Sequence, residues 1–165
     1  MMKKKVFFLL FLLLSTSVLM DGCGSQESSA PSQEAENKKS EWVEEENGEM
    51  KMNVNVNGQD FTATLEQNSA VSALVQMMEN GPVTLQLSDY AGFEKVGPLG
   101  QSLPASNSQT TTQSGDIVLY QGNQIVMFYG SNSWSYTRIG RIDDLTGWEE
   151  ALVSGDVTVT LSVED

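Results

Sequence analysis

Several short runs from Met50 onward alternate strictly between apolar and polar residues, and this alternation limits how the 165-residue chain can fold. A period of two places every second side chain on the same face of a β-strand. The first such run extends from Met50 to Val56, and the last from Val157 to Val163. Because strands with one apolar face must bury that face against other elements, the pattern predicts a mainly β domain.

Turn residues divide the alternating runs into strands. Asn57-Gly58 follows the first run directly, and this dipeptide is the strongest short-range signal for a hairpin, so a paired strand is expected through Phe61, Ala63 and Leu65. A second hairpin is expected where Gln121-Gly122-Asn123 joins two apolar runs. Besides the strands already named, strands are expected at Val83 to Leu87, Asp116 to Tyr120, Gln124 to Tyr129 and Tyr136 to Ile142.

Two stretches have helical signals instead. One begins at Ser69 and ends at Asn80-Gly81, with an apolar stripe at the i, i+3, i+4 and i+7 positions Val71, Leu74, Val75 and Met78. In the other, Thr146 and Glu149 have capping-box spacing, which predicts a short helix that ends near Gly155.

The elements add up to a single domain. The polar stretch from Pro98 to Ser114 is expected to be a long loop, which is often a binding element in a compact domain. Residues 50–165 are long enough for one core, and they contain seven or eight predicted strands and two short helices. We therefore expect a closed β-barrel of about eight strands with helices at its ends.

The N-terminus has the pattern of an export signal. Three lysines at positions 3–5 precede an unbroken apolar run from Val6 to Leu14, and a weaker stretch continues to Met20. This segment is shorter than the roughly 20 residues that a membrane-spanning helix needs. Residues 1–22 are therefore expected to be a signal peptide and not a permanent anchor.

Cys23 follows this segment in Met20-Asp21-Gly22-Cys23, which resembles the lipobox of bacterial lipoproteins, although Met20 and Asp21 depart from its usual residues. The resemblance implies cleavage before Cys23 and lipid, such as palmitate, on its sulfur. Cys23 is the only cysteine, so it has no intramolecular disulfide partner. The alternative is an ordinary secretory signal with an incidental cysteine. The lipoprotein interpretation predicts a membrane-anchored protein outside the cytoplasm.

Residues 23–49 have almost nothing apolar to bury and carry eight Glu against two Lys. Such a composition cannot offset the entropy of ordering the backbone, so this segment is expected to be a disordered tether. The whole chain has a formal net charge of −13. A strongly negative surface repels nucleic acid, which is therefore not an expected partner. The chain is expected to act as a monomer.

Four segments resemble the small bacterial cyclophilin-like proteins: Ser88 to Leu99, Gln101 to Pro104, Gly115 to Ile125 and Tyr129 to Gly140. The resemblance covers Met50 to Glu164 and implies a cyclophilin-like barrel. It does not imply efficient prolyl isomerase activity, because Phe93-Glu94-Lys95 stands where true cyclophilins have Phe-His-Arg. Lysine does not replace the planar fork of arginine. The resemblance implies that Gln101 corresponds to the catalytic glutamine, but Val126 falls where an aromatic residue would form the pocket floor.

Other catalytic classes are excluded by composition. The chain has no histidine, and its one cysteine is expected to carry lipid, so it cannot build a Ser-His-Asp or Cys-His system or a usual zinc site. The acidic pairs Asp143-Asp144 and Glu149-Glu150 are interpreted as residues favoured by a helix dipole. No cofactor and no metal ion is expected.

A candidate binding face remains, and its residues combine aromatic rings with cations and an amide. They are Tyr90, Phe93, Lys95, Gln101, Tyr120, Trp134, Tyr136 and Arg138. Cations beside aromatic residues could receive a carboxylate or an amide carbonyl. In the alternative interpretation the rings are core or rim residues and the cations pair with nearby acids. Two functions follow: a tethered binding module for a peptide or small ligand, or a weak prolyl isomerase for exported proteins that would use Lys95 and Gln101.

Overall fold

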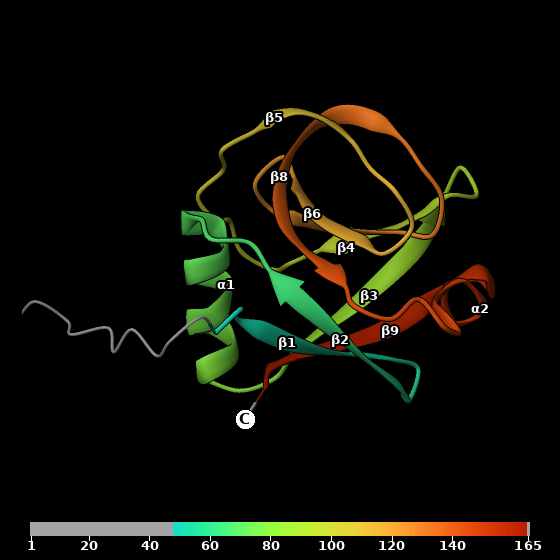
Figure 1. The fold of residues 1–165 in the computed structure, drawn as a ribbon, viewed down its shortest axis with the longest axis horizontal. Helices are drawn as coiled ribbons and strands as arrows, with labels where there is room; N and C mark the ends of the chain where they lie inside the picture. Colours follow the sequence, from blue (N-terminus) through green and yellow to red (C-terminus); the bar gives the residue numbers. More distant parts are fainter. Residues whose placement is uncertain (1–47, 165) are drawn as a thin grey trace, which may run out of the picture. The chain divides into compact units, whose positions relative to one another are not determined.

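The computed structural model describes residues 48–164, which form nine strands and two short helices (Figure 1). The predicted signal peptide, Cys23 and the predicted tether up to residue 47 lie outside the described residues. In chain order the elements are β1 (Lys51–Val56), β2 (Gln59–Leu65), α1 (Ser69–Glu79), β3 (Val83–Tyr90), β4 (Glu94–Pro98), β5 (Ser108–Thr111), β6 (Asp116–Tyr120), β7 (Gln124–Phe128), β8 (Ser133–Ile142), α2 (Trp148–Val153) and β9 (Val157–Val163).

Eight of the strands close into an antiparallel barrel. Their order is β2-β1-β9-β3-β4-β7-β6-β8, and β8 pairs back onto β2, with Ala63 opposite Ile142 and Leu65 opposite Gly140. Strand β5 lies outside this ring and pairs with the first half of β8. The predicted barrel is therefore confirmed, with β5 as an added edge strand.

Both predicted hairpins are present. Asn57 and Gly58 connect β1 to β2 with φ values of 49° and 93°, the left-handed conformation that a two-residue type I′ turn requires at both positions. Residues 121–123 connect β6 to β7, with φ values of 51° at Gln121 and 76° at Gly122. Local turn chemistry thus sets the register of both pairs.

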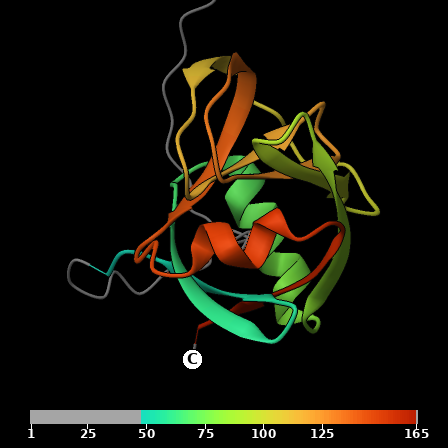
Figure 2. The ribbon, with the colours of Figure 1, turned by 90° about the vertical axis from the view of Figure 1, so that its right-hand side faces the viewer.

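The two helices cover opposite ends of the barrel, as Figures 1 and 2 both show. Helix α1 begins after Asn68, whose side chain accepts a hydrogen bond from the Val71 N–H, and its C-cap is Asn80. Its apolar face, which includes Leu74 and Met78, is buried against the barrel core. The predicted helix and its stop are confirmed.

Helix α2 forms where it was expected, but the predicted capping box does not. Its N-cap is Gly147 in the left-handed conformation, with no side-chain cap. The Asp144 side chain accepts a hydrogen bond from the Thr146 N–H at 2.9 Å, so Thr146 ends a turn before the helix begins. Of the acidic pairs, Glu149 and Glu150 do lie in the first turn of α2.

Asp143, by contrast, has a partner far along the chain. Its carboxylate forms an ion pair with Lys51 at 2.7 Å and accepts a hydrogen bond from the Thr64 hydroxyl at 2.6 Å. The interpretation of Asp143 as a helix-dipole residue is therefore wrong, because its contacts hold the β8 end against β1 and β2.

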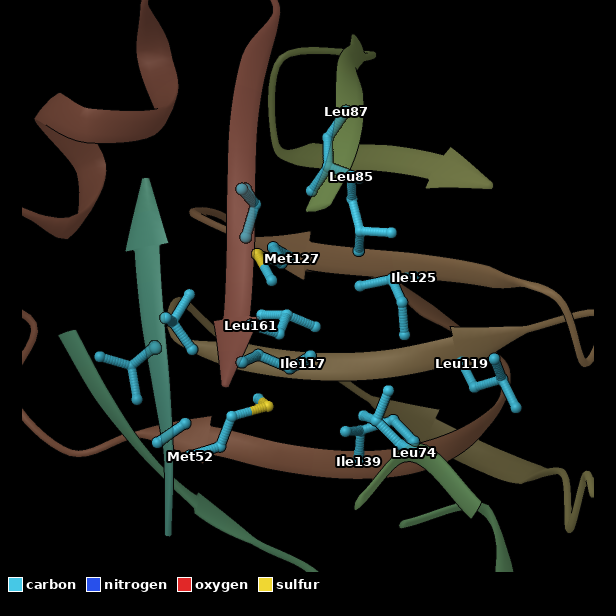
Figure 3. Packing of buried hydrophobic residues seen from close by; sticks show 14 of the residues in the cluster. Met52, Leu74, Leu85, Leu87, Ile117, Leu119, Ile125, Met127, Ile139 and Leu161 are labelled. Carbon is cyan, nitrogen blue, oxygen red and sulfur yellow. The ribbon is translucent and has the colours of Figure 1, made fainter. Parts of the chain in front are cut away.

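The barrel interior is filled by apolar side chains from every barrel strand except β4, together with both helices. Figure 3 shows part of this core, including Met52, Leu74 and Leu161. From α2, the Trp148 ring packs edge-on against Phe61, with 5.0 Å between centroids. The Trp148 Nε1–H donates to the Phe128 backbone carbonyl at 2.8 Å. Trp148 therefore closes this end of the barrel, and its buried N–H has a hydrogen-bond acceptor.

Two strands were not predicted. Strand β4 contains Glu94, Lys95, Gly97 and Pro98, none of which favours a strand. Strand β5 lies inside the stretch from Pro98 to Ser114, so the prediction of one uninterrupted loop there is wrong. Its Ser, Gln and Thr residues pair with one strand only, so no apolar alternation marks it.

No helix within residues 48–164 is long and apolar enough to span a membrane.

Candidate functional site

The wall formed by β4, β7, β6 and β8 has buried side chains on both faces. The inner face contributes Ile117, Ile125 and Met127 to the barrel core. The outer face carries a second, separate apolar cluster, made of Val118, Val126, Phe128 and Tyr136 with Phe93, Val96 and Tyr120 packed against it. Val118, Val126, Phe128 and Tyr136 are at most 4% exposed, so neighbouring side chains already cover most of this outer face.

A pocket of about 430 Å³ opens on this outer face, and we call it the aromatic pocket. Such a volume is in the range of small-molecule sites. Its lining consists of Tyr90, Glu94, Val96, Tyr120, Gln124, Val126, Asn132, Trp134 and Tyr136.

The rim of the aromatic pocket is exposed and its floor is buried. The rim residues Tyr90 and Trp134 are 61% and 56% exposed, whereas Val126 and Tyr136 are buried. Exposed aromatic side chains beside a hollow are available for contact with a ligand.

Aromatic contacts fix the floor. The Tyr136 ring lies 6.0 Å from the Tyr120 ring and 5.8 Å from the Phe128 ring, both in edge-to-face geometry. Such pairs contribute about 0.5–1.5 kcal/mol beyond their buried area. Burial raises the pKa of the Tyr136 hydroxyl, so this group stays neutral at physiological pH.

Asn132 is held in the pocket wall by the segment that follows β5. The Thr112 N–H donates to the Asn132 carbonyl at 2.8 Å, and the Thr112 hydroxyl donates to the same oxygen at 3.0 Å. The Asn132 side-chain amide in turn donates to the Tyr136 hydroxyl at 3.1 Å. The polar stretch between β4 and β6 therefore positions Asn132, although none of its own residues lines the aromatic pocket.

Glu94 is the one charged residue among the nine that line the aromatic pocket. It is 5% exposed, and its Oε2 atom has no hydrogen-bond partner among the described residues. Burial raises the pKa of the Glu94 carboxyl from 4.5 to about 7. Perturbed, buried carboxyls without partners cluster at functional sites.

Strand pairing explains why Glu94 faces the pocket. Residues directly opposite each other on paired strands point to the same face of a sheet. Glu94 is opposite Tyr90 on β3 and Phe128 on β7, and both neighbours belong to the outer face.

Comparison with known proteins assigns the fold to a family. The model of the Cyclophilin-like family matches residues 54–162, which is most of the barrel. The chain belongs to the cyclophilin-like family. The match reaches every barrel strand, including β3, β4 and β7, which contribute residues to the aromatic pocket.

Two solved structures are similar to this chain at low sequence identity. The solution structure of a hypothetical protein from Archaeoglobus fulgidus is 14% identical, with a TM-score of 0.50, over 70% of this chain and 95% of that one. McbB in complex with tryptophan is 10% identical, with a TM-score of 0.47, over 68% of this chain and 44% of that one. The search of curated proteins found no match. The first likeness supports the fold alone.

Five of the eight predicted site residues gather on this side of the cyclophilin-like barrel. Tyr90, Tyr120, Trp134 and Tyr136 line the aromatic pocket. Phe93 belongs to the outer cluster and packs edge-on against Tyr90, with 6.3 Å between ring centroids.

Lys95 faces the other way. It is opposite Met127, a barrel-core residue, and its side chain is 0% exposed. Its Nζ atom donates to the Gly155 carbonyl at 2.7 Å and forms an ion pair with Asp89 at 3.0 Å. Lys95 thus ties β4 to the loop before β9 and does not line the aromatic pocket.

Asp89 connects this lysine to a further group. The Tyr129 hydroxyl donates to the Asp89 carboxylate, and these hydrogen bonds lower the pKa of Asp89. The Lys95 Nζ lies 5.6 Å from the centre of the Tyr129 ring. The Lys95 ammonium group is therefore paired with groups of the protein itself.

Gln101 and Arg138 are also separate from the aromatic pocket. Gln101 lies in a shallow hollow beside α1, with Ala73 and Met77. Arg138 is half-buried on β8, with its Nη1 atom 3.8 Å from Asp116 Oδ1. The structure therefore does not bring Lys95, Gln101 and the aromatic residues into one cleft.

Glu94 is a candidate site residue that the sequence did not predict. It lies within the Phe93-Glu94-Lys95 segment, in which only Phe93 and Lys95 were expected to belong to the binding face. An acid two residues before Val96 on the same strand face was the available signal, but it required the assignment of β4. Among residues 48–164, no three His, Cys, Asp or Glu side chains come together as a metal site would need.

Proposed function

We propose that the cyclophilin-like domain is a binding module and that the aromatic pocket holds its ligand, a peptide or a small molecule. The observation that carries this proposal is Glu94, a buried carboxyl with an unpaired oxygen, at the base of a hollow lined with aromatic rings. Binding sites combine mostly apolar walls with a few convergent polar groups. Glu94, Gln124 and Asn132 supply these groups here.

Binding without catalysis is favoured by what the aromatic pocket contains. A weak prolyl isomerase would need Lys95 or another cation to polarise the prolyl amide. Lys95 is fully buried beside Asp89, and Gln101 lies beside α1. None of the nine lining residues carries a positive charge.

We further propose that the module acts outside the cytoplasm, anchored to a membrane. The N-terminal pattern supports export, cleavage before Cys23 and attachment of lipid to its sulfur. Several acyl chains on one residue hold a protein at a bilayer, because each buried CH₂ contributes about 0.8 kcal/mol. The acidic segment would then separate the barrel from the membrane by roughly 25–30 Å. Mass spectrometry of the membrane fraction tests this part: unmodified Cys23, or an intact 1–22 segment, would contradict it.

A ligand screen with matched variants tests the binding proposal. A library of small amides and amines is screened against the full chain in detergent by saturation-transfer NMR. Trp134→Ala and Tyr90→Ala remove rim side chains that are more than half exposed, so both variants should fold. Each should weaken a pocket ligand about fivefold or more, as expected for an aromatic contact residue.

The controls are Leu145→Ala and Val153→Ala, which remove exposed apolar side chains that do not line the aromatic pocket. These variants should bind as the unmodified chain does. An empty screen, or ligands that bind all four variants equally, would refute the proposed function.

A further inference from the structure

We propose that the aromatic pocket recognises an alkylammonium group that carries at least one N–H, such as the side chain of lysine in a peptide, with the Glu94 carboxylate as its counter-ion. This inference rests on the proposed function, because it names the chemical class of the ligand that the same pocket binds.

The unpaired oxygen of Glu94 points to a hydrogen-bond donor. Its Oε2 atom is buried without a partner among the described residues. Buried polar atoms are nearly always hydrogen-bonded, and leaving one unpaired is costly. A ligand N–H would supply the missing donor, and a positive charge on it would stabilise the ionised carboxylate.

The aromatic lining favours the same ligand. Tyr90, Tyr120, Trp134 and Tyr136 surround the hollow above Glu94. Cations within about 6 Å of an aromatic ring face are attracted by the ring quadrupole, and most strongly when they are desolvated. The methylene groups of a lysine side chain would pack against the same rings.

Charge argues against an anionic ligand. The neighbour Lys95 is engaged on the inner face, and Arg138 on β8 lies near Asp116. The net charge of the chain is −13, which attracts cations and repels anions over several ångströms.

The titratable groups that face Glu94 come from three strands: Tyr90 on β3, Tyr120 on β6 and Tyr136 on β8. Strand β7 contributes only Val126, Phe128 and Gln124 to this face, and on β8 the Arg138 Nη1 atom lies 3.8 Å from Asp116 Oδ1. Tyrosine hydroxyls are neutral below pH 9 or so. Because burial raises the pKa of the Glu94 carboxyl to about 7, affinity for the ammonium group should rise between pH 5 and 8.

The test uses two probes that differ only in the charged group. Nα-acetyl-lysine methylamide carries the ammonium group, and Nα-acetyl-norleucine methylamide has the same aliphatic chain without it. Each is titrated into the full chain in detergent at pH 8, with the Trp134 indole NMR signal as the readout. We expect the lysine probe to bind at least about tenfold more tightly, as for a hydrogen bond to a charged group.

Two variants test whether the preference for the lysine probe depends on Glu94 itself or on the overall negative charge of the chain. Glu94→Gln keeps the side-chain shape but removes the charge, and it should abolish the preference for the lysine probe. Glu79→Gln removes an exposed acid at the end of α1 and should leave the preference unchanged. The comparison of the two probes on the unmodified chain does not depend on any variant folding.

Failure of this inference is distinguishable from failure of the proposed function. Equal binding of the two probes, no binding of the lysine probe, or a preference that survives Glu94→Gln would overturn the ammonium assignment. If neutral amides from the screen still bind in a Trp134-dependent way, the aromatic pocket remains a binding site of another class. If no compound binds there, both proposals fail.

Discussion

The substitution Glu94→Gln should stabilise the free protein at pH 8 but not at pH 4. Burial raises the pKa of the Glu94 carboxyl from 4.5 to about 7 in the folded chain. Between these pH values the folded state keeps a proton that the unfolded state has lost. The stability associated with the neutral carboxyl is therefore fully present below pH 4.5 and is lost as the pH rises through about 7.

The size of this effect follows from the two pKa values. They differ by about 2.5, and each pKa unit corresponds to about 1.4 kcal/mol, so ionised Glu94 costs the folded state roughly 3 kcal/mol at pH 8. This is a large part of the 5–15 kcal/mol that typically separates folded from unfolded domains. Glutamine has a similar shape and never ionises, so the variant avoids the cost.

The assay is urea denaturation of both chains at pH 4 and pH 8, followed by far-ultraviolet circular dichroism. Asp89 and Asp143 have lowered pKa values, so both chains lose stability in acid for that reason. This loss cancels when the two chains are compared at the same pH. The difference in unfolding free energy between variant and unmodified chain should grow by roughly 3 kcal/mol from pH 4 to pH 8.

Glu79→Gln is the control, because its side chain is exposed and does not line the aromatic pocket. Its effect should be the same at both pH values. Two results would refute the description of Glu94 as a desolvated carboxyl. In one, Glu94→Gln changes the unfolding free energy by the same amount at pH 4 and pH 8. In the other, Glu94→Gln is less stable than the unmodified chain at pH 8 only.

Two further substitutions test the barrel around the pocket, and both are measured by the same urea denaturation. Lys95→Ala should lower the unfolding free energy by about 2–4 kcal/mol, because it leaves a cavity in a fully buried position, yet it should leave the affinity for the lysine probe unchanged. A loss of binding in a folded Lys95→Ala chain would show that Lys95 contributes to the ligand site after all. Gly97→Ala should lower the unfolding free energy by about 1–3 kcal/mol, because its Cβ would collide with the Gln86 backbone oxygen of β3; an unchanged stability would contradict the close approach of β3 and β4.

Local signals were sufficient for much of the fold. Asn57-Gly58 placed the first hairpin, because a type I′ turn needs two residues that accept positive φ. The stripe through Leu74 and Met78 placed α1, because one apolar face of a helix must be buried. In each case the residues that determine the element lie within the element itself.

Strand β4 could not be predicted in this way. Lys95 reads as a surface residue, but Asp89 and the carbonyl of Gly155, 60 positions along the chain, satisfy its charge inside the protein. Gly97 reads as a turn residue, but it is required because β3 passes too closely for a side chain. Both causes are tertiary, so periodicity and propensity give no sign of them.

Only part of the candidate site could be predicted, because its other residues also depend on tertiary contacts. Tyr90, Tyr120, Trp134 and Tyr136 were identified as aromatic residues within segments of family resemblance, and the barrel brings them together. Glu94 and Lys95 are neighbours in sequence, but the alternation of a strand sends their side chains to opposite faces. The choice between them needed the register of β4 with β7, in which Glu94 is opposite Phe128.

The most direct test of the ligand assignment is the NMR titration of the Glu94 side-chain carboxyl carbon in the full chain, with and without the lysine probe. In the free chain the titration midpoint should lie at about 7. Saturation with the lysine probe should lower it by about one unit or more, because a tenfold preference for the ionised carboxylate corresponds to one pKa unit. A free midpoint near 4.5, or a midpoint that the lysine probe leaves unchanged, would contradict the account of Glu94 as the counter-ion in a ligand pocket.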